Sequence, residues 1–135
     1  MITFELARRL REAGVVWTPV TGDRFLIPDR EMDDAVFVVS DMVVEAHTLP
    51  SGPLLRFNGT TEWALDSIPQ EETLWLPREE QLRALLGTTF VALEASDEGY
   101  VVVSERDGFR ASHQDADAEC AYAVAVLALC EGTPA

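Results

Sequence analysis

The sequence contains no lysine: all ten of its basic residues are arginine, against 24 acidic residues, and the formal net charge is −14. The missing amine excludes two classes of protein. A phosphate-binding loop of the G-x-x-x-x-G-K-[ST] type contacts the β- and γ-phosphates through its lysine, and a pyridoxal enzyme forms a Schiff base on a lysine. We therefore expect neither a nucleotide site of this type nor a pyridoxal cofactor.

Positive charge of any kind is scarce. A protein this acidic repels nucleic-acid phosphates unless its cations gather on one face. The local cluster is Arg8, Arg9 and Arg11, and Glu5 and Glu12 dilute it. We expect no nucleic-acid partner. Because the acidic residues are interspersed with apolar ones, we also expect no carboxylate array that mimics DNA.

Cysteine and histidine are few, with two of each. Cys120 and Cys130 lie about 15 Å apart along the axis of a predicted helix, too far to bridge, so each is interpreted as a small buried residue in a reducing compartment. His47 and His113 fall in separate predicted elements, and neither begins an H-x-x-x-H or C-x-x-C pattern. A zinc site needs three or four convergent ligands, so we predict no metal and no cofactor.

Long hydrophobic runs are also absent. The longest, residues 120–130, is about eleven residues, well short of the roughly 20 that span a bilayer. The first residues lack the charged start, apolar run and small-residue cleavage site of a signal peptide. We expect a cytoplasmic protein with no membrane partner.

Catalytic patterns are missing too. The acidic residues 29–34 fail as a calcium loop, because Asp34 stands where glycine is required and Ser40 where glutamate is required. There is no G-x-S-x-G motif, and Cys120 has no adjacent histidine. Adjacent carboxylates such as Glu79 and Glu80 are typical of solvated charge rather than of an acid and base pair. The sequence therefore favours a non-enzymatic protein over an enzyme.

What the sequence does contain is a hydrophobic period that changes along the chain. Helical spacing and end signals predict helices over residues 3–13, from Pro77 to Gly87 and from about 114 to 131. A period of two predicts short strands, with one hairpin joining 15–19 to 24–28, a second turning at Asn58-Gly59 and a third joining 88–95 to 99–106. Further strand runs are expected at 35–40 and 42–49, and a loop at 50–53. Turns are expected at Ser40-Asp41 and Asp107-Gly108.

These elements predict the fold class. Antiparallel strands with helices at the ends and one helix between them indicate an α+β domain. We predict an antiparallel β-sheet of about six to eight strands with N-terminal, middle and C-terminal helices. At 135 residues, the chain has the length of one ordinary domain, so we expect a single domain over residues 1–135.

The last predicted helix is apolar nearly all the way round. A small-residue stripe follows one face, with a tyrosine beside it: Ala118, Ala121, Ala125, Ala128 and Tyr122. A helix that is hydrophobic on all sides must be covered on all sides, and one sheet covers only one face. We therefore predict a homodimer, with these five residues at its interface.

Two tryptophans surround an acidic connector. Trp63 and Trp75 flank Asp66, Glu71 and Glu72. The tryptophans can be core anchors. Alternatively, one is partly exposed beside the carboxylates and docks an Arg-rich partner surface. The leading hypothesis is a protein-interaction or assembly domain, and the alternative is a small-molecule-binding or hydrolytic protein with a pocket near Trp63, Asp66 and Trp75.

The stretches "FNGTTEWALDS" and "LWLPREEQLRALLG" resemble small actinobacterial proteins of unknown function that are often labelled pilus assembly protein CpaE. The label itself is not supported by the residues, because true CpaE-type proteins resemble ParA-like ATPases with a lysine-bearing phosphate loop, and this chain has no lysine. The resemblance implies a compact cytoplasmic domain and assigns no activity and no site residue.

Overall fold

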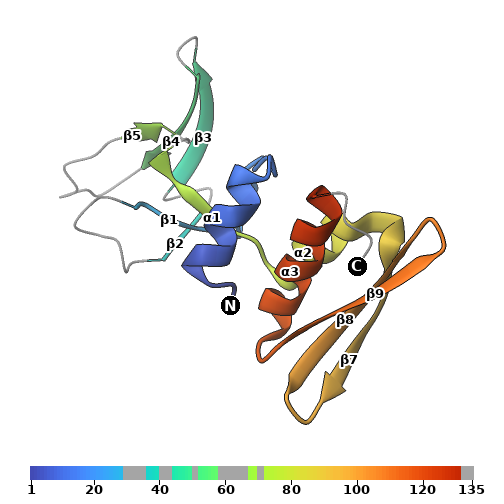
Figure 1. Cartoon of the computed structure of the whole chain (residues 1–135). Coiled ribbons are helices and arrows are strands. Elements are labelled where there is room, and N and C mark those ends of the chain that lie inside the picture. The colour runs from blue at the N-terminus through green and yellow to red at the C-terminus, as the bar shows by residue number, and fades with distance from the viewer. Residues whose placement is uncertain (29–35, 40–43, 50–51, 58–66, 70–71, 132–135) are drawn as a thin grey trace. The chain divides into compact units, whose positions relative to one another are not determined.

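A computed structural model describes the chain except residues 29–35, 40–43, 50–51, 58–66, 70–71 and 132–135 (Figure 1). The chain divides into two compact units. Unit 1 comprises Met1–Val16 and Pro77–Ala135, and unit 2 comprises Trp17–Leu76. Each unit is described by itself. The prediction of one domain over residues 1–135 stays a prediction.

Unit 1 contains all three α-helices of the described residues and one antiparallel sheet of strand order β7-β8-β9. Its elements are α1 (Phe4–Glu12), α2 (Glu79–Leu86), the 3-10 turn η2 (Gly87–Thr89), β7 (Phe90–Ser96), β8 (Gly99–Arg106), β9 (Phe109–Asp115) and α3 (Ala118–Cys130). Figure 1 shows α3 lying beside this sheet and α2 next to α3. Helix α3 therefore covers one face of the sheet, and α1 and α2 pack against α3.

Helix α1 confirms the N-terminal helix predicted from sequence. The side chain of Thr3 accepts a hydrogen bond from the backbone N–H of Leu6 at 3.2 Å, which satisfies one of the free donors of the first turn. Ala7 and Leu10 are buried. Helical spacing thus turns these two side chains toward the interior of unit 1.

Helix α2 begins two residues later than predicted. Its N-cap is Arg78, whose backbone N–H donates to Oε1 of Gln81 at 2.9 Å, so Pro77 lies outside the helix rather than at its first position. The C-terminal end agrees with the prediction, because Gly87 has a φ of 59°. Positive φ is a conformation that glycine adopts without the penalty of a Cβ.

The sheet of unit 1 confirms the predicted β7–β8 hairpin and adds a strand that the sequence did not predict. Asp107 and Gly108 have φ values of 52° and 83°, which fits a two-residue type I′ turn, and β9 pairs with β8 along its whole length. The predicted start of the last helix at residue 114 is wrong, because Gln114 belongs to β9. Helix α3 starts only after its N-cap Asp117, which accepts from the Cys120 N–H at 3.0 Å.

Helix α3 is covered within unit 1. It packs against α1, α2, β8 and β9, and Ala121, Tyr122 and Ala125 are fully or almost fully buried. The ring of Tyr122 stacks on that of Phe90 with centroids 5.8 Å apart. Ala118 and Ala128, the other two predicted interface residues, are half-buried. Two further helices supply the cover that the sequence argument assigned to a second chain, so the homodimer loses this argument and stays a prediction.

Unit 2 holds two further three-stranded antiparallel sheets, of order β2-β1-β6 and β3-β4-β5. Its strands are β1 (Arg24–Leu26), β2 (Phe37–Val38), β3 (Val44–Leu49), β4 (Gly52–Phe57), β5 (Ser67–Pro69) and β6 (Leu74–Leu76). The described residues thus have the predicted α+β class. Their strands form three small sheets rather than the one sheet of six to eight strands that was predicted. The period of two identifies strands but does not say which strands share a sheet.

Aromatic residues build the core of unit 2. Trp17, Phe25, Ile27 and Val39 are buried together, and Phe37 and Trp75 pack against them. The ring of Trp17 lies 5.6 Å from that of Phe25 and 6.3 Å from that of Trp75, stacked in the second case at an interplanar angle of 7°. Such pairs add to the stabilisation from burial alone.

One predicted hairpin of unit 2 is wrong. Residues 15–19 contain no strand, and β1 pairs instead with β2 and β6. Trp17 joins the core from a segment without regular structure. The predicted turns at Ser40-Asp41 and Asn58-Gly59 lie outside the described residues. The predicted loop at 50–53 does so in part, since β4 already includes Gly52 and Pro53.

Candidate functional site

The acidic connector with its tryptophans was the first candidate site. Trp63, Asp66 and Glu71 lie outside the described residues, so the structure does not place them. Glu72 is exposed, and Trp75 lies on β6 with its ring in the aromatic core of unit 2. For Trp75, which is half-buried, the core-anchor and docking interpretations therefore both stay predictions.

Polar groups accompany the two described tryptophans. The indole N–H of Trp17 donates to Oδ2 of Asp23 at 2.9 Å, and the same oxygen accepts from the backbone N–H of Val20 at 2.9 Å. Asp23 is fully buried. By contrast, the buried Nε1 of Trp75 has no hydrogen-bond partner among the residues that the structure describes. Buried donors are nearly always satisfied, so this N–H is an exception among those residues.

The two histidines lie on strands of different units. His47 lies on β3 opposite Leu54 of β4. His113 lies on β9 and is 8 % exposed, and its imidazole makes no hydrogen bond within the described part of the chain. Burial lowers the pKa of His113, because desolvation disfavours the charged imidazolium. His113 is therefore neutral at physiological pH.

A narrow recess opens beside His113 on the α3 side of the sheet. It is lined from five elements, among them Leu86 of α2, Thr89 of η2, Ser104 and Arg106 of β8, Phe109 and His113 of β9, and Ala128 and Leu129 of α3. Phe109 is 62 % exposed, which is the largest exposure of any aromatic side chain described. The recess therefore combines apolar side chains with hydroxyl groups, the Arg106 guanidinium and the His113 imidazole.

The outer edge of β9 forms the open side of this region. The two-residue turn makes Arg106 and Phe109 a hydrogen-bonded pair, and bonded pairs then alternate along an antiparallel ladder. The backbone groups of Arg110, Ser112 and Gln114 therefore point away from β8. No backbone N–H or C=O of these three residues has a protein partner in the part of the chain that the structure describes.

The two edges of the sheet are not alike. Strand β7, the other edge, has a register irregularity between Phe90 and Ala92, which breaks the ladder. Bulges of this kind protect edge strands from pairing with other chains. Strand β9 has neither a bulge nor a proline over seven residues. We name the outward backbone groups of Arg110, Ser112 and Gln114, with Phe109, the β9 edge.

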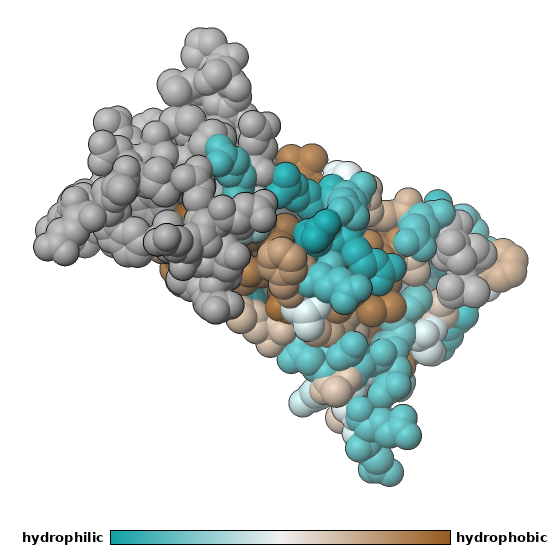
Figure 2. Space-filling model, turned by 60° about the vertical axis from the view of Figure 1, so that its left-hand side comes forward, coloured by the Kyte–Doolittle hydropathy of each residue, from teal (hydrophilic) through white to brown (hydrophobic). Residues whose placement is uncertain are grey.

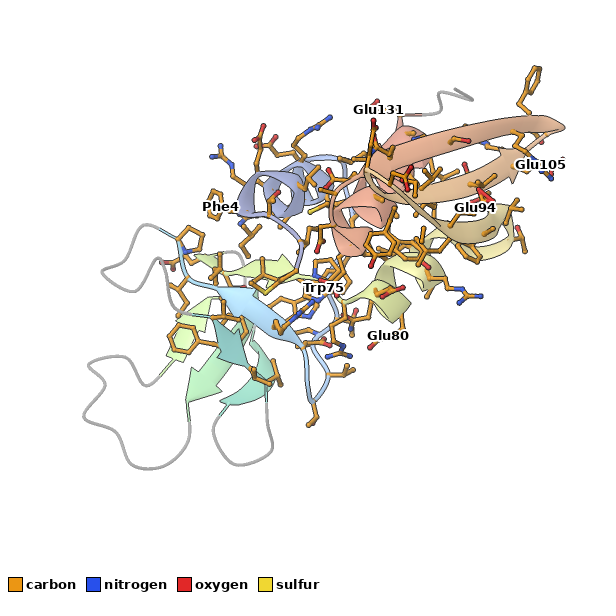
Figure 3. All side chains as sticks on the ribbon, turned by 90° about the horizontal axis from the view of Figure 1, so that it is seen from below. Phe4, Trp75, Glu80, Glu94, Glu105 and Glu131 are labelled. Carbon is orange, nitrogen blue, oxygen red and sulfur yellow. The ribbon has the colours of Figure 1, made fainter. Side chains whose placement is uncertain are left out.

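The charges nearest the β9 edge are already paired. Nη2 of Arg110 lies 3.2 Å from Oε2 of Glu105, and Nε of Arg106 lies 3.8 Å from Oδ2 of Asp107. Figure 3 shows Glu105 near the tip of the β8–β9 hairpin. The Arg110 side chain is thus held over its own sheet by a cross-strand pair and does not screen the outward backbone groups.

The two cysteines differ in their surroundings. Both are unbridged, as predicted, but only Cys120 is buried, whereas Cys130 is exposed. Burial raises the pKa of the Cys120 thiol, with smaller contributions of both signs from neighbouring groups, so that its nucleophilic thiolate is disfavoured. Within the described residues, no three histidine, cysteine or carboxylate side chains are placed to hold a metal ion.

The surface agrees with the interspersed charges of the sequence. Figure 2 shows hydrophilic side chains over much of the visible face of the described residues, interrupted by hydrophobic ones. Among the described residues, no helix has the length and apolar character needed to cross a membrane.

Sequence reasoning missed the β9 edge. The signal that identifies it is Asp107-Gly108, which directly follows the β-prone run 99–106. Such a pair favours a type I′ turn, and this turn predicts a second strand immediately after it. The residues after the turn, "FRASHQD", contain no valine, isoleucine or threonine, so propensity alone does not favour a strand there. No protein-family model, curated protein or solved structure was found to match this chain.

Proposed function

We propose that this chain is a non-enzymatic protein-interaction domain that binds an extended segment of another chain along the β9 edge. The observation that carries this proposal is the row of outward backbone groups at Arg110, Ser112 and Gln114 on an unbulged strand, which have no partner among the described residues. Strand addition to such an edge is a recurring mode of peptide recognition, in which main-chain hydrogen bonds supply the affinity.

Two further features support strand addition. Phe109 presents an exposed aromatic ring at the start of the strand, and aromatic residues are enriched at the centres of protein interfaces. The recess beside His113 lies on the face to which alternate side chains of an added strand point. The edge thus offers hydrogen bonds, and Phe109 with the mouth of the recess offers contact surface beside them.

A site-specific photo-crosslink tests this function. We expect a benzoylphenylalanine at Ser112, with its backbone outward on β9, to crosslink a defined partner in cells at a yield well above background. The matched control is the same amino acid at Ala95, whose backbone points outward on the opposite, irregular edge. Equal crosslinking at the two positions, or none at Ser112, would contradict the proposed function.

The alternative function, a small-molecule-binding or hydrolytic protein with a pocket near Trp63, Asp66 and Trp75, keeps one supporting observation. Within the described residues, the buried indole N–H of Trp75 lacks an acceptor. A thermal-shift screen of metabolites tests it: a stabilising compound whose effect is lost in both Asp66→Ala and Trp75→Phe would favour this alternative, since each change removes one polar group of the site.

A further inference from the structure

We propose that the segment added along the β9 edge is a basic one: an extended stretch of a partner protein with arginine or lysine at every second position and apolar residues between them. This inference rests on the proposed function and names the partner's chemistry. It follows from the two faces that an added strand acquires and from the charge of the molecule.

The two faces of an added strand meet different surroundings. Side chains aligned with Phe109, Ala111 and His113 point toward α3, where the recess is lined by apolar side chains together with Thr89, Ser104, Arg106 and the His113 imidazole. A cationic side chain would lose hydration there and would meet Arg106, a charge of the same sign. Apolar residues therefore fit this face of the added strand.

The other face of the added strand meets exposed polar groups. Side chains aligned with Arg110, Ser112 and Gln114 lie on the face of the sheet that also carries Glu94 and Glu105. These two carboxylates are labelled on the strands in Figure 3. Glu105 on this face is paired with Arg110, so the sign of an added charge is set by the molecule as a whole. Charged side chains stay hydrated on this face, and the net charge of −14 favours cations there.

Charge decides between a basic partner and a second copy of the chain. The net charge of −14 attracts a cationic segment and repels another copy. Arg106 and Arg110, the two cations nearest the edge, are each within 4 Å of a carboxylate of the same chain. They therefore have little unpaired charge with which to attract an acidic partner.

Titration of the full chain with three nine-residue peptides tests this inference. Each peptide alternates valine with one polar residue, which is arginine, glutamine or glutamate. We expect the arginine peptide to bind at least about tenfold more tightly than the glutamate peptide, with the glutamine peptide between them. Raising the salt from about 50 mM to about 500 mM should reduce this difference, because exposed charges are screened.

The position of binding is tested by removing single outward N–H groups. We expect the arginine peptide to slow amide exchange at Arg110, Ser112 and Gln114. Ser112→Pro should weaken its binding about tenfold or more, because proline cannot donate, and Ala95→Pro on the other edge should leave it unchanged. If Ser112→Pro does not fold, Phe109→Ser, at an exposed side chain, should still weaken binding severalfold.

Three results would overturn the inference. They are equal or tighter binding of the glutamate peptide, exchange protection on β7 instead of β9, and a dimer of the chain alone whose amides at the β9 edge are already protected. None of these results determines whether a partner crosslinks at Ser112, which is the test of the proposed function. A partner captured there that proves acidic, or a second copy, would leave the proposed function standing while removing the basic segment.

Discussion

At the scale of single residues, the buried His113 predicts a pH dependence of stability. Its pKa in the folded chain is lowered from the ordinary value of 6.5 by burial, so the unfolded chain takes up the proton first as pH falls. The stabilisation is complete above pH 6.5 and is lost as pH drops from there toward the folded pKa. We expect His113→Gln to flatten this slope between pH about 7 and the onset of carboxylate titration near about 5.

The measurement is denaturant unfolding followed by helical circular dichroism over that pH range. Both chains would carry His47→Gln, so that the second histidine does not titrate. An unchanged slope in His113→Gln would show that burial of this imidazole does not govern acid stability.

Glu119 is a second residue whose contacts predict a measurable effect. Its Oε1 accepts from the backbone N–H of Ile2 at 3.1 Å, and its Oε2 accepts from that of Glu79, the first residue of α2, at 3.2 Å. The carboxylate thus joins α3 to the entry of α1 and to the start of α2. We expect Glu119→Ala to reduce the free energy of unfolding by about 1–3 kcal/mol, because two backbone donors lose their acceptor.

The matched control is Glu131→Ala, an exposed glutamate that directly follows α3. We expect a change within about 0.5 kcal/mol there. Glu119→Gln keeps one acceptor oxygen and should fall between the two. Equal stabilities of the two alanine variants, measured by urea unfolding, would refute the bridging role of Glu119.

At the scale of elements, two glycines of the β7-β8-β9 sheet predict unequal costs. Gly108, in the type I′ turn, has a φ of 83° and open space where a Cβ would stand, so Gly108→Ala should cost about 1 kcal/mol. Gly99 has a φ of 127°, and its Cβ would lie 2.5 Å from Cα of Ala116 and from the carbonyl oxygen of Asp115. We expect Gly99→Ala to cost about 3 kcal/mol or more, because backbone atoms must move.

Chemical denaturation of the two variants measures this difference. The comparison is internal, since both glycines have positive φ and only Gly99 meets the backbone that joins β9 to α3. If Gly108→Ala proved as costly as Gly99→Ala, conformational strain rather than close backbone approach would set both costs.

At the scale of the whole molecule, the division into two units predicts that two spectroscopic probes report different unfolding transitions. All three tryptophans, Trp17, Trp63 and Trp75, belong to unit 2, while α1, α2 and α3 belong to unit 1. Tryptophan fluorescence therefore reports on unit 2 and helical circular dichroism on unit 1. Because each unit has its own buried core, we expect different unfolding midpoints by the two probes.

The same urea titration, read by both signals, makes this measurement. Superimposable curves would mean one cooperative unit and would favour the single domain predicted from sequence. Distinct midpoints would assign a separate stability to each unit. A Trp75→Phe variant should then shift only the fluorescence transition, because its ring packs in the unit 2 core.

Some elements could be predicted from the sequence because their causes lie close together along the chain. Thr3 caps α1, Gly87 ends α2, and the run before Asp107-Gly108 forms the second strand of a hairpin. Pairing of β1 with β6 could not be predicted, because Phe25 and Trp75 meet across about fifty residues of sequence. Hydrophobic period carries no information about which distant strand is the partner.

The sequence by itself determined the α+β class, the acidic charge and the absence of the lysine chemistries, since composition and local periodicity suffice for these. Only the tertiary structure decided what surrounds the apolar last helix. Two helices and a sheet of the same unit bury Tyr122 and Ala125, where local reasoning required a second chain. It also decided which backbone groups are available at the β9 edge. Pairing with β8 satisfies alternate backbone groups of β9 and leaves those of the residues between them facing outward.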